Sequence, residues 1–149
     1  MSDSTTEGGC LCGAVRYRIA GQPRTSSICH CRTCRRASGA PSVAWFVVRT
    51  EQFSLLHGDL STFASSMPVL RQFCGRCGSP IAYRHADDPA SIELTTASLD
   101  DPESFPPSRE IWLSHRLSWQ AIDSRREQDP DESQVQPQQT DSRGNNSRA

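Results

Sequence analysis

Seven cysteines fall into three short clusters, and their spacing constrains the fold more than any other feature of the chain. The clusters are Cys10-Leu11-Cys12, Cys29-His30-Cys31-Arg32-Thr33-Cys34 and Cys74-Gly75-Arg76-Cys77. Two close pairs of thiolates from distant segments can complete a tetrahedral structural zinc site. The outer pairs therefore predict a structural zinc held by Cys10, Cys12, Cys74 and Cys77, whose binding contributes folding free energy.

The central cluster supplies Cys29, Cys31 and Cys34, and three protein ligands with one open position are typical of catalytic zinc. Cys31 and Cys34 are three residues apart, so we expect them to share the first turn of a helix. A histidine as fourth ligand would instead close the site. We expect His30 to point away from the metal, and His57, His85 and His115 to be ordinary turn or surface residues. The sequence thus predicts two zinc ions per chain.

Two other uses of the cysteines are less consistent with the sequence. A disulfide framework normally has an even number of cysteines and an oxidising compartment, whereas the count here is odd and the N-terminus has no apolar signal segment. A redox pair is possible at Cys31–Cys34 or Cys74–Cys77, but the additional Cys29 argues against it. Free thiols and the lack of a signal predict a cytoplasmic protein.

Composition excludes several functional classes. The net charge of the 149 residues is −1, and no basic stripe alternates with aromatic residues, so we expect no nucleic-acid partner. No apolar run approaches the roughly 20 residues of a membrane span. Every basic residue is an arginine, which excludes Schiff-base catalysis by lysine.

The pattern of apolar residues predicts one β-rich domain over residues 8–123, between a flexible segment at 1–7 and a disordered polar tail at 124–149. The run at 43–48 is continuously apolar, as in a strand buried on both faces. One short helix is expected to begin near Cys31, run to Ser38 and end at Gly39. The other expected strands cover residues 14–19, 53–56, 60–64, 69–73, 81–83, 92–96 and 111–113.

An open zinc site with three sulfur ligands is soft, and its natural fourth ligand is another thiolate. This favours chemistry on a small thiol or on its adduct with a carbonyl compound. No glutamate lies beside the central cluster, so the signature of the zinc deaminases is absent.

The segments GGCLCGAV at 8–15, CHCRTCRRASGAP at 29–41 and RQFCGRCGS at 71–79 together resemble the glutathione-dependent formaldehyde-activating enzyme family, also called the centromere-protein-V/GFA domain. The resemblance implies an all-β fold, a β-tent of short antiparallel strands stapled by zinc, with one short helix at the central cysteines. It also implies that Cys29, Cys31 and Cys34 are the catalytic set. The activity it implies joins glutathione and formaldehyde into S-hydroxymethylglutathione, a carbon–sulfur lyase reaction.

The mechanism expected from this resemblance has the glutathione sulfur attack formaldehyde as a thiolate, after which the alkoxide takes a proton. Arg35, Arg36 or Arg76 could hold the glutathione carboxylates, because guanidinium groups match carboxylates in geometry. Two alternatives stay open. A non-catalytic zinc-binding interaction module requires the second site to be closed, and a thiol redox enzyme requires a metal-free cysteine in the central cluster.

Overall fold

A computed structural model of the protein describes residues 4–131, which form a mostly β structure with one short α-helix, as predicted. The strands are β1 (Thr5–Gly9), β2 (Arg16–Ala20), β3 (Thr25–Cys29), β4 (Val43–Arg49), β5 (Phe53–His57), β6 (Leu60–Ser66), β7 (Val69–Cys74), β8 (Pro80–His85), β9 (Ser91–Thr95), β10 (Arg109–Ile111) and β11 (Glu127–Gln128). The helix α1 covers Arg32–Ser38, and 3-10 turns cover Thr50–Gln52, Thr96–Ser98, Pro102–Ser104 and Leu113–His115. Among the described residues, no helix has the length and apolar character needed to cross a membrane.

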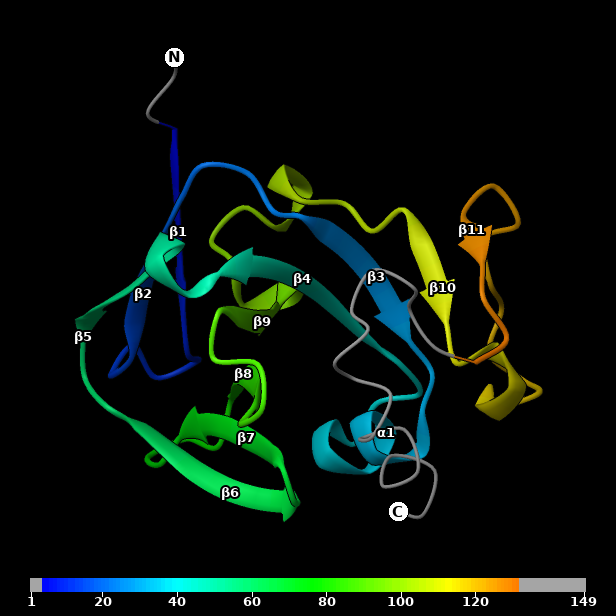
Figure 1. Ribbon diagram of the computed structural model, residues 1–149, viewed down its shortest axis with the longest axis horizontal. Helices are drawn as coiled ribbons and strands as arrows, with labels where there is room; N and C mark the ends of the chain where they lie inside the picture. The colour runs from blue at the N-terminus through cyan, green and yellow to red at the C-terminus, as the bar shows by residue number, and fades with distance from the viewer. Residues whose placement is uncertain (1–3, 132–149) are drawn as a thin grey trace.

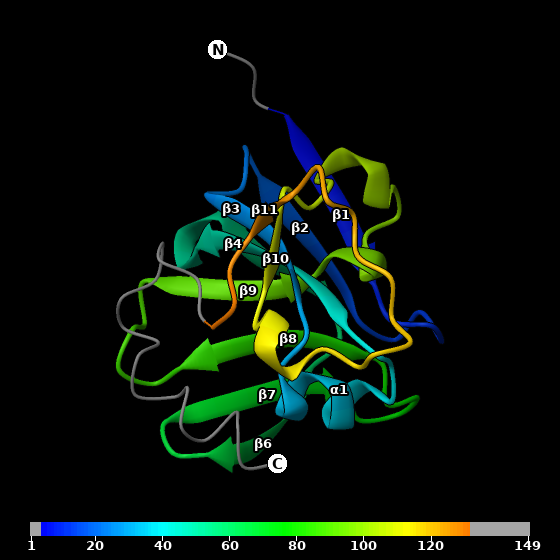
Figure 2. The ribbon, with the colours of Figure 1, turned by 90° about the vertical axis from the view of Figure 1, so that its right-hand side faces the viewer.

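The strands form two sheets. A three-stranded sheet has the order β1-β2-β5, and an eight-stranded sheet has the order β11-β10-β3-β4-β9-β8-β7-β6 (Figure 1). Most pairs are antiparallel, as predicted, but β10 runs parallel to both β3 and β11. These pairs join segments distant in the sequence, so no hairpin turn imposes an antiparallel direction on them. Figure 2 shows β10 and β11 lying next to β3 at this end of the sheet.

The two faces of the large sheet carry separate hydrophobic cores, because successive strand residues point to opposite sides. Phe46 of β4 faces the small sheet and packs in a core that includes Tyr17 and Ile19. Its neighbour Trp45 belongs to the other core, together with Tyr83 of β8. The run at 43–48 is thus covered on both sides, as its composition predicted.

Three strands were not predicted, and two of them change the expected domain boundaries. Strand β1 covers Thr5–Gly9, so the ordered fold begins inside the segment expected to be flexible. Strand β11 pairs with β10, and Asp129 and Pro130 hydrogen-bond to the backbone of residues 110–114, so the fold continues beyond residue 123. The predicted tail at 132–149 lies outside the described residues. Strand β3 was also missed, because Ser26 and Ser27 interrupt its apolar pattern.

The strand expected at residues 111–113 lies slightly earlier, because the extended backbone ends at Ile111. Trp112 has a left-handed conformation, with φ of 59°, and starts a 3-10 turn instead. The other seven predicted strands correspond to β2 and β4–β9, with boundaries shifted by a few residues.

Helix α1 begins and ends as predicted. Cys31 is its N-cap residue and accepts a hydrogen bond from the Cys34 backbone N–H. Gly39 ends the helix with φ of 69°, a conformation that glycine adopts without steric cost, and donates its N–H to the Arg35 carbonyl. The helix therefore places Cys31 and Cys34 on the same turn, beside the end of β3.

Candidate metal centres

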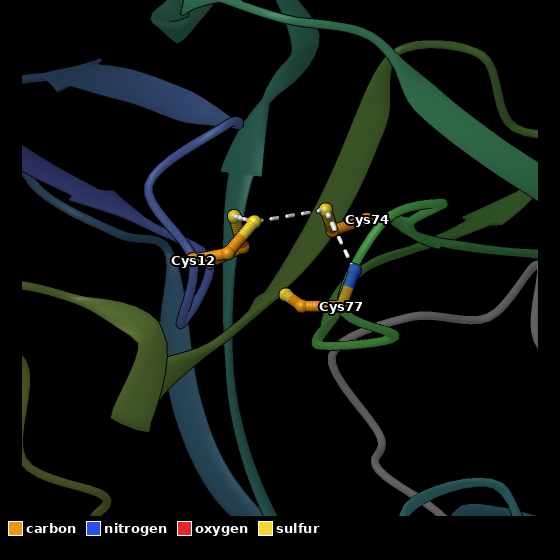
Figure 3. Close-up of side chains that lie close together, drawn as sticks. Cys12, Cys74 and Cys77 are labelled. Carbon is orange, nitrogen blue, oxygen red and sulfur yellow. Dashed lines mark hydrogen bonds between the residues drawn. The ribbon is translucent and has the colours of Figure 1, made fainter.

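The first cluster brings together two distant segments of the chain (Figure 3). Cys10 and Cys12 lie on the turn that leads from β1 to β2, whereas Cys74 ends β7 and Cys77 lies on the turn before β8. The Cys10 and Cys12 sulfurs are 3.6 Å apart, and the Cys12 and Cys74 sulfurs are 3.9 Å apart. All four sulfurs lie within 4.8 Å of one another, so the structure brings this predicted ligand set together.

Backbone amides point toward these sulfurs. The Arg76 and Cys77 N–H groups each donate to Cys74 Sγ at 3.4 Å, and the Val15 N–H donates to Cys10 Sγ at 3.2 Å. Ser79 lies 3.1 Å from Cys77 Sγ, and this contact lowers the pKa of the Cys77 thiol to about 5. These contacts favour the thiolate at Cys77, the form in which cysteine binds metal, whereas the neighbouring sulfurs raise the pKa of the Cys12 thiol to about 11.

The spacing of the sulfurs fits zinc. Four sulfurs arranged tetrahedrally at about 2.3 Å from a zinc ion are about 3.8 Å from one another. The separations of Cys12 Sγ from Cys10 Sγ and from Cys74 Sγ, 3.6 and 3.9 Å, lie on either side of that value. An all-sulfur donor set suits zinc far better than calcium or magnesium, which prefer oxygen ligands.

The second cluster contains Cys29, Cys31 and Cys34, which are all buried and also lie within 4.8 Å of one another. Cys29 ends β3, and the other two belong to the N-terminal turn of α1. Hydrogen bonds from the Cys29 and Cys34 thiols lower the pKa of Cys31 to about 3. The same contact with Cys31 raises the pKa of Cys29 well above its ordinary value, so the three sulfurs share a negative charge that would attract a cation.

Histidine adds no ligand to either cluster within the described part of the chain. His30 Nε2 lies 2.6 Å from Glu110 Oε1, away from the cysteine cluster, as predicted. His57 is exposed, in keeping with its predicted surface position, and His115 stacks on Trp112. The prediction for His85 is wrong, because this side chain is 5% exposed and lies at the end of β8. The second cluster therefore offers three possible metal ligands among residues 4–131.

Arg71 is a site residue that the sequence analysis missed. Its two terminal nitrogens lie 3.8 and 3.9 Å from Cys34 Sγ, and its guanidinium carbon lies 5.1 Å from the centre of the Tyr83 ring. Burial alone would lower the pKa of Arg71, but its contacts with Cys34, together with Tyr83 and Cys31, outweigh burial and raise it. The available signal was strand alternation, because Arg71 lies between Val69 and Phe73 on one face of β7.

A cavity of about 570 Å³ lies against this second cluster. Cys34 and Arg71 are part of its wall, together with Trp45 and Arg36. Of the three arginines proposed to hold carboxylates, only Arg36 lines this cavity, whereas Arg35 and Arg76 do not. The cavity gives a small molecule access to the three-cysteine site and to two guanidinium groups.

Comparison with known proteins agrees with this arrangement. Residues 5–115 match the profile of the family described as glutathione-dependent formaldehyde-activating enzyme. The chain belongs to this family. The match spans both cysteine clusters and ends before β11, so the family resemblance seen in the cysteine motifs is confirmed.

The chain is similar to one further protein in sequence and to one solved structure in fold. A protein of Halomonas elongata, provisionally named a glutathione-dependent formaldehyde-activating enzyme, is 30% identical over 142 residues, which cover 85% of this chain and 90% of the relative. The crystal structure of a Rhodobacter sphaeroides protein superimposes with a TM-score of 0.54 at 20% identity, covering 66% of this chain and 93% of the other. The second likeness concerns the fold alone.

Proposed function

We propose that this protein is a zinc-dependent carbon–sulfur lyase that joins glutathione and formaldehyde into S-hydroxymethylglutathione. The observation that carries the proposal is the second cluster, where three buried thiols lie together and one of them, Cys34, lines a cavity, in a member of this family. The name of the Halomonas elongata relative supports the same two substrates. Because no fourth ligand completes the cluster within residues 4–131, the site suits a reaction better than a purely structural role.

The two clusters have different roles in this proposal. Cys10, Cys12, Cys74 and Cys77 would hold a structural zinc that joins the turn after β1 to the end of β7 and the turn after it, as in the zinc-stapled β-tent that the family resemblance implies. Cys29, Cys31 and Cys34 would hold the second ion. When bound there, zinc lowers the pKa of a thiol that reaches it and so supplies a thiolate nucleophile at neutral pH.

The reaction forms one C–S bond and moves the thiol proton to oxygen. An electron pair of the glutathione sulfur forms the C–S bond, the carbonyl π pair of formaldehyde moves to oxygen, and the proton lost by the thiol is returned to that oxygen. Arg71 offsets the negative charge of Cys34 and so lowers the electrostatic cost of bringing a further thiolate beside it. Arg36, at the exposed side of the same cavity, is placed to pair with a glutathione carboxylate.

Free thiols are needed at both clusters, and all seven cysteines are unpaired in the described residues. The proposed chemistry therefore fits a reducing compartment such as the cytoplasm, where disulfides are rare. The partners in this proposal are a small thiol and an aldehyde.

Cobalt substitution tests the proposal, because the visible spectrum of Co²⁺ reports its ligands. We expect the absorption bands of the cobalt-loaded protein to change and saturate as glutathione is added. S-methylglutathione, which has no free thiol, serves as the matched control and should leave them unchanged. A Cys29→Ser variant that keeps cobalt in the first cluster should not respond to glutathione.

Unchanged bands in the parent protein would contradict the proposal and favour a non-catalytic module with a closed second site. Alkylation of a central cysteine in the fully metal-loaded protein would instead favour a thiol redox enzyme.

A further inference from the structure

The cavity beside Cys34 has an apolar, largely aromatic wall. Trp45, Phe63 and Phe73 contribute three aromatic side chains to it, and Val43 and Pro80 add further apolar surface. Trp45 is 5% exposed and fixed by an edge-on contact with Tyr83, with ring centres 5.9 Å apart. Phe63 on β6 is 62% exposed, so a large aromatic group stands uncovered at the cavity.

The charged groups around this wall are cationic. Arg36 and Arg71 line the cavity, and no acidic side chain does so within residues 4–131. No carboxylate pairs with Arg71 in the same described part of the chain, where its charge faces Cys34 instead. A ligand that fits these walls therefore carries negative charge at one end and an apolar group at the other.

Formaldehyde contributes a single carbon, and glutathione is a polar tripeptide, so together they leave the aromatic wall without a partner. A volume of about 570 Å³ lies in the range of sites that enclose whole organic ligands. We propose that this cavity receives an apolar side chain on the aldehyde-derived carbon, so that the protein acts on adducts of aryl or branched alkyl aldehydes. This inference rests on the proposed function and specifies its substrate class.

The chemistry is the same as for formaldehyde. The thiol sulfur forms a bond to the aldehyde carbon, the carbonyl π pair moves to oxygen, and the thiol proton ends on that oxygen as a hydroxyl group. The product differs only in the side chain on the new carbon. Because Cys34 and the aromatic wall belong to one cavity, that side chain can lie against Trp45 and Phe63 while the sulfur stays near the cysteines.

Calorimetric titration of the zinc-loaded full chain with two thioethers tests this directly. S-benzylglutathione and S-methylglutathione share the tripeptide and differ in one aromatic ring. We expect the benzyl compound to bind at least tenfold more tightly, because its ring is buried against apolar surface. Phe63→Ala should reduce this ratio severalfold. Leu56→Ala removes a partly exposed apolar side chain from β5, outside the cavity wall, and should leave the ratio unchanged.

A second variant adds bulk in place of removing it. Ala37 lies on α1 at the cavity wall, and Ala37→Leu should fill the space and lower affinity for the benzyl compound alone. Equal affinities of the parent protein for the two thioethers, or no binding of either, would overturn the inference. So would a Phe63→Ala effect of equal size on both compounds.

Turnover separates this inference from the proposed function. With glutathione fixed, we expect a higher kcat/KM for benzaldehyde than for formaldehyde. A benzyl preference without turnover of either aldehyde would reject the lyase activity and keep the cavity assignment. Turnover of formaldehyde without any benzyl preference would keep the lyase activity and reject the larger substrate class.

Discussion

The Nε2 atom of His30 lies 2.6 Å from Oε1 of Glu110, and the two side chains are only 1% and 2% exposed. The other carboxylate oxygen of Glu110 accepts a hydrogen bond from Arg126 Nη1 at 2.8 Å. His30 stands between two of the central cysteines, Cys29 and Cys31. This buried chain of contacts therefore ties the second cluster to β10 and to the segment that follows residue 123.

Replacing Glu110 with alanine should destabilise the fold strongly. The substitution leaves His30 without its partner in a buried site, and removing one member of a buried pair typically costs about 3–5 kcal/mol. We expect a decrease of about 3 kcal/mol in the free energy of unfolding, measured by urea denaturation. Glu127→Ala is the control, because Glu127 is 65% exposed in its ion pair with Arg109 and should contribute less than about 1 kcal/mol. Equal decreases in the free energy of unfolding of Glu110→Ala and Glu127→Ala would contradict the structural role of the buried pair.

Two adjacent arginines test the role of the segment beyond residue 123. Arg126 donates to the Pro107 carbonyl and to buried Glu110, whereas Arg125 pairs only locally with Asp123. Arg126→Ala should lower the free energy of unfolding by about 1–3 kcal/mol, since it removes a charged partner from a buried carboxylate. Arg125→Ala should change it by less than about 0.5 kcal/mol.

The same urea titration measures both variants, and its slope should stay constant if the folded and unfolded states keep their compactness. If Arg125→Ala lowered the free energy of unfolding as much as Arg126→Ala, the positive charge of this segment and not the contact with Glu110 would stabilise the fold. An unchanged free energy of unfolding in Arg126→Ala would mean that the contacts of Arg126 do not stabilise the fold around the central cluster.

Much of this architecture follows from local sequence signals. The cysteine spacing predicted both clusters, because close pairs can meet only by folding distant turns together. The helix at Cys31 was predictable from its cap and from Gly39, which are local features. The buried strand at 43–48 was predictable because its apolar run leaves no polar face.

Long-range pairing explains what the sequence could not predict. Strand β10 lies beside β3 although some eighty residues separate them, as in the pairing of Arg109 with Ser27. Glu110 was not singled out in the sequence, because its partner His30 is equally distant in the chain. Arg71 was missed for a similar reason, since only the fold shows that its face of β7 covers Cys34.

The two cysteine clusters should respond differently to mutation. Cys74→Ser removes a ligand from the cluster that joins two turns, so we expect loss of one zinc and a large loss of β structure by circular dichroism. Cys31→Ser should also remove one zinc but leave the spectrum nearly unchanged, because the other cluster remains complete. Metal content by mass spectrometry under native conditions gives the stoichiometry of each variant. If Cys31→Ser unfolded while Cys74→Ser kept its β structure, the second cluster and not the first would be the structural one.

Arg71 should matter more to activity than any other arginine near the clusters. Arg71→Met keeps most of the side-chain volume but removes the charge beside Cys34. We expect kcat/KM for glutathione to fall about 10- to 100-fold, the size of effect expected for a lost charged contact of about 1.4–2.8 kcal/mol. Arg71→Lys should recover part of this loss, because it restores the charge without the planar geometry of the guanidinium group.

Arg76→Met is the matched control for this substitution. Arg76 is exposed, lies between two cysteines of the first cluster and does not line the cavity, so its side chain should contribute little to turnover. Glutathione-dependent changes in the cobalt spectrum provide a second readout, and Arg71→Met should shift their midpoint to higher glutathione concentration while Arg76→Met leaves it in place. If both variants lose activity equally, the effect reflects the general positive charge of the surface and the specific role of Arg71 at Cys34 is wrong.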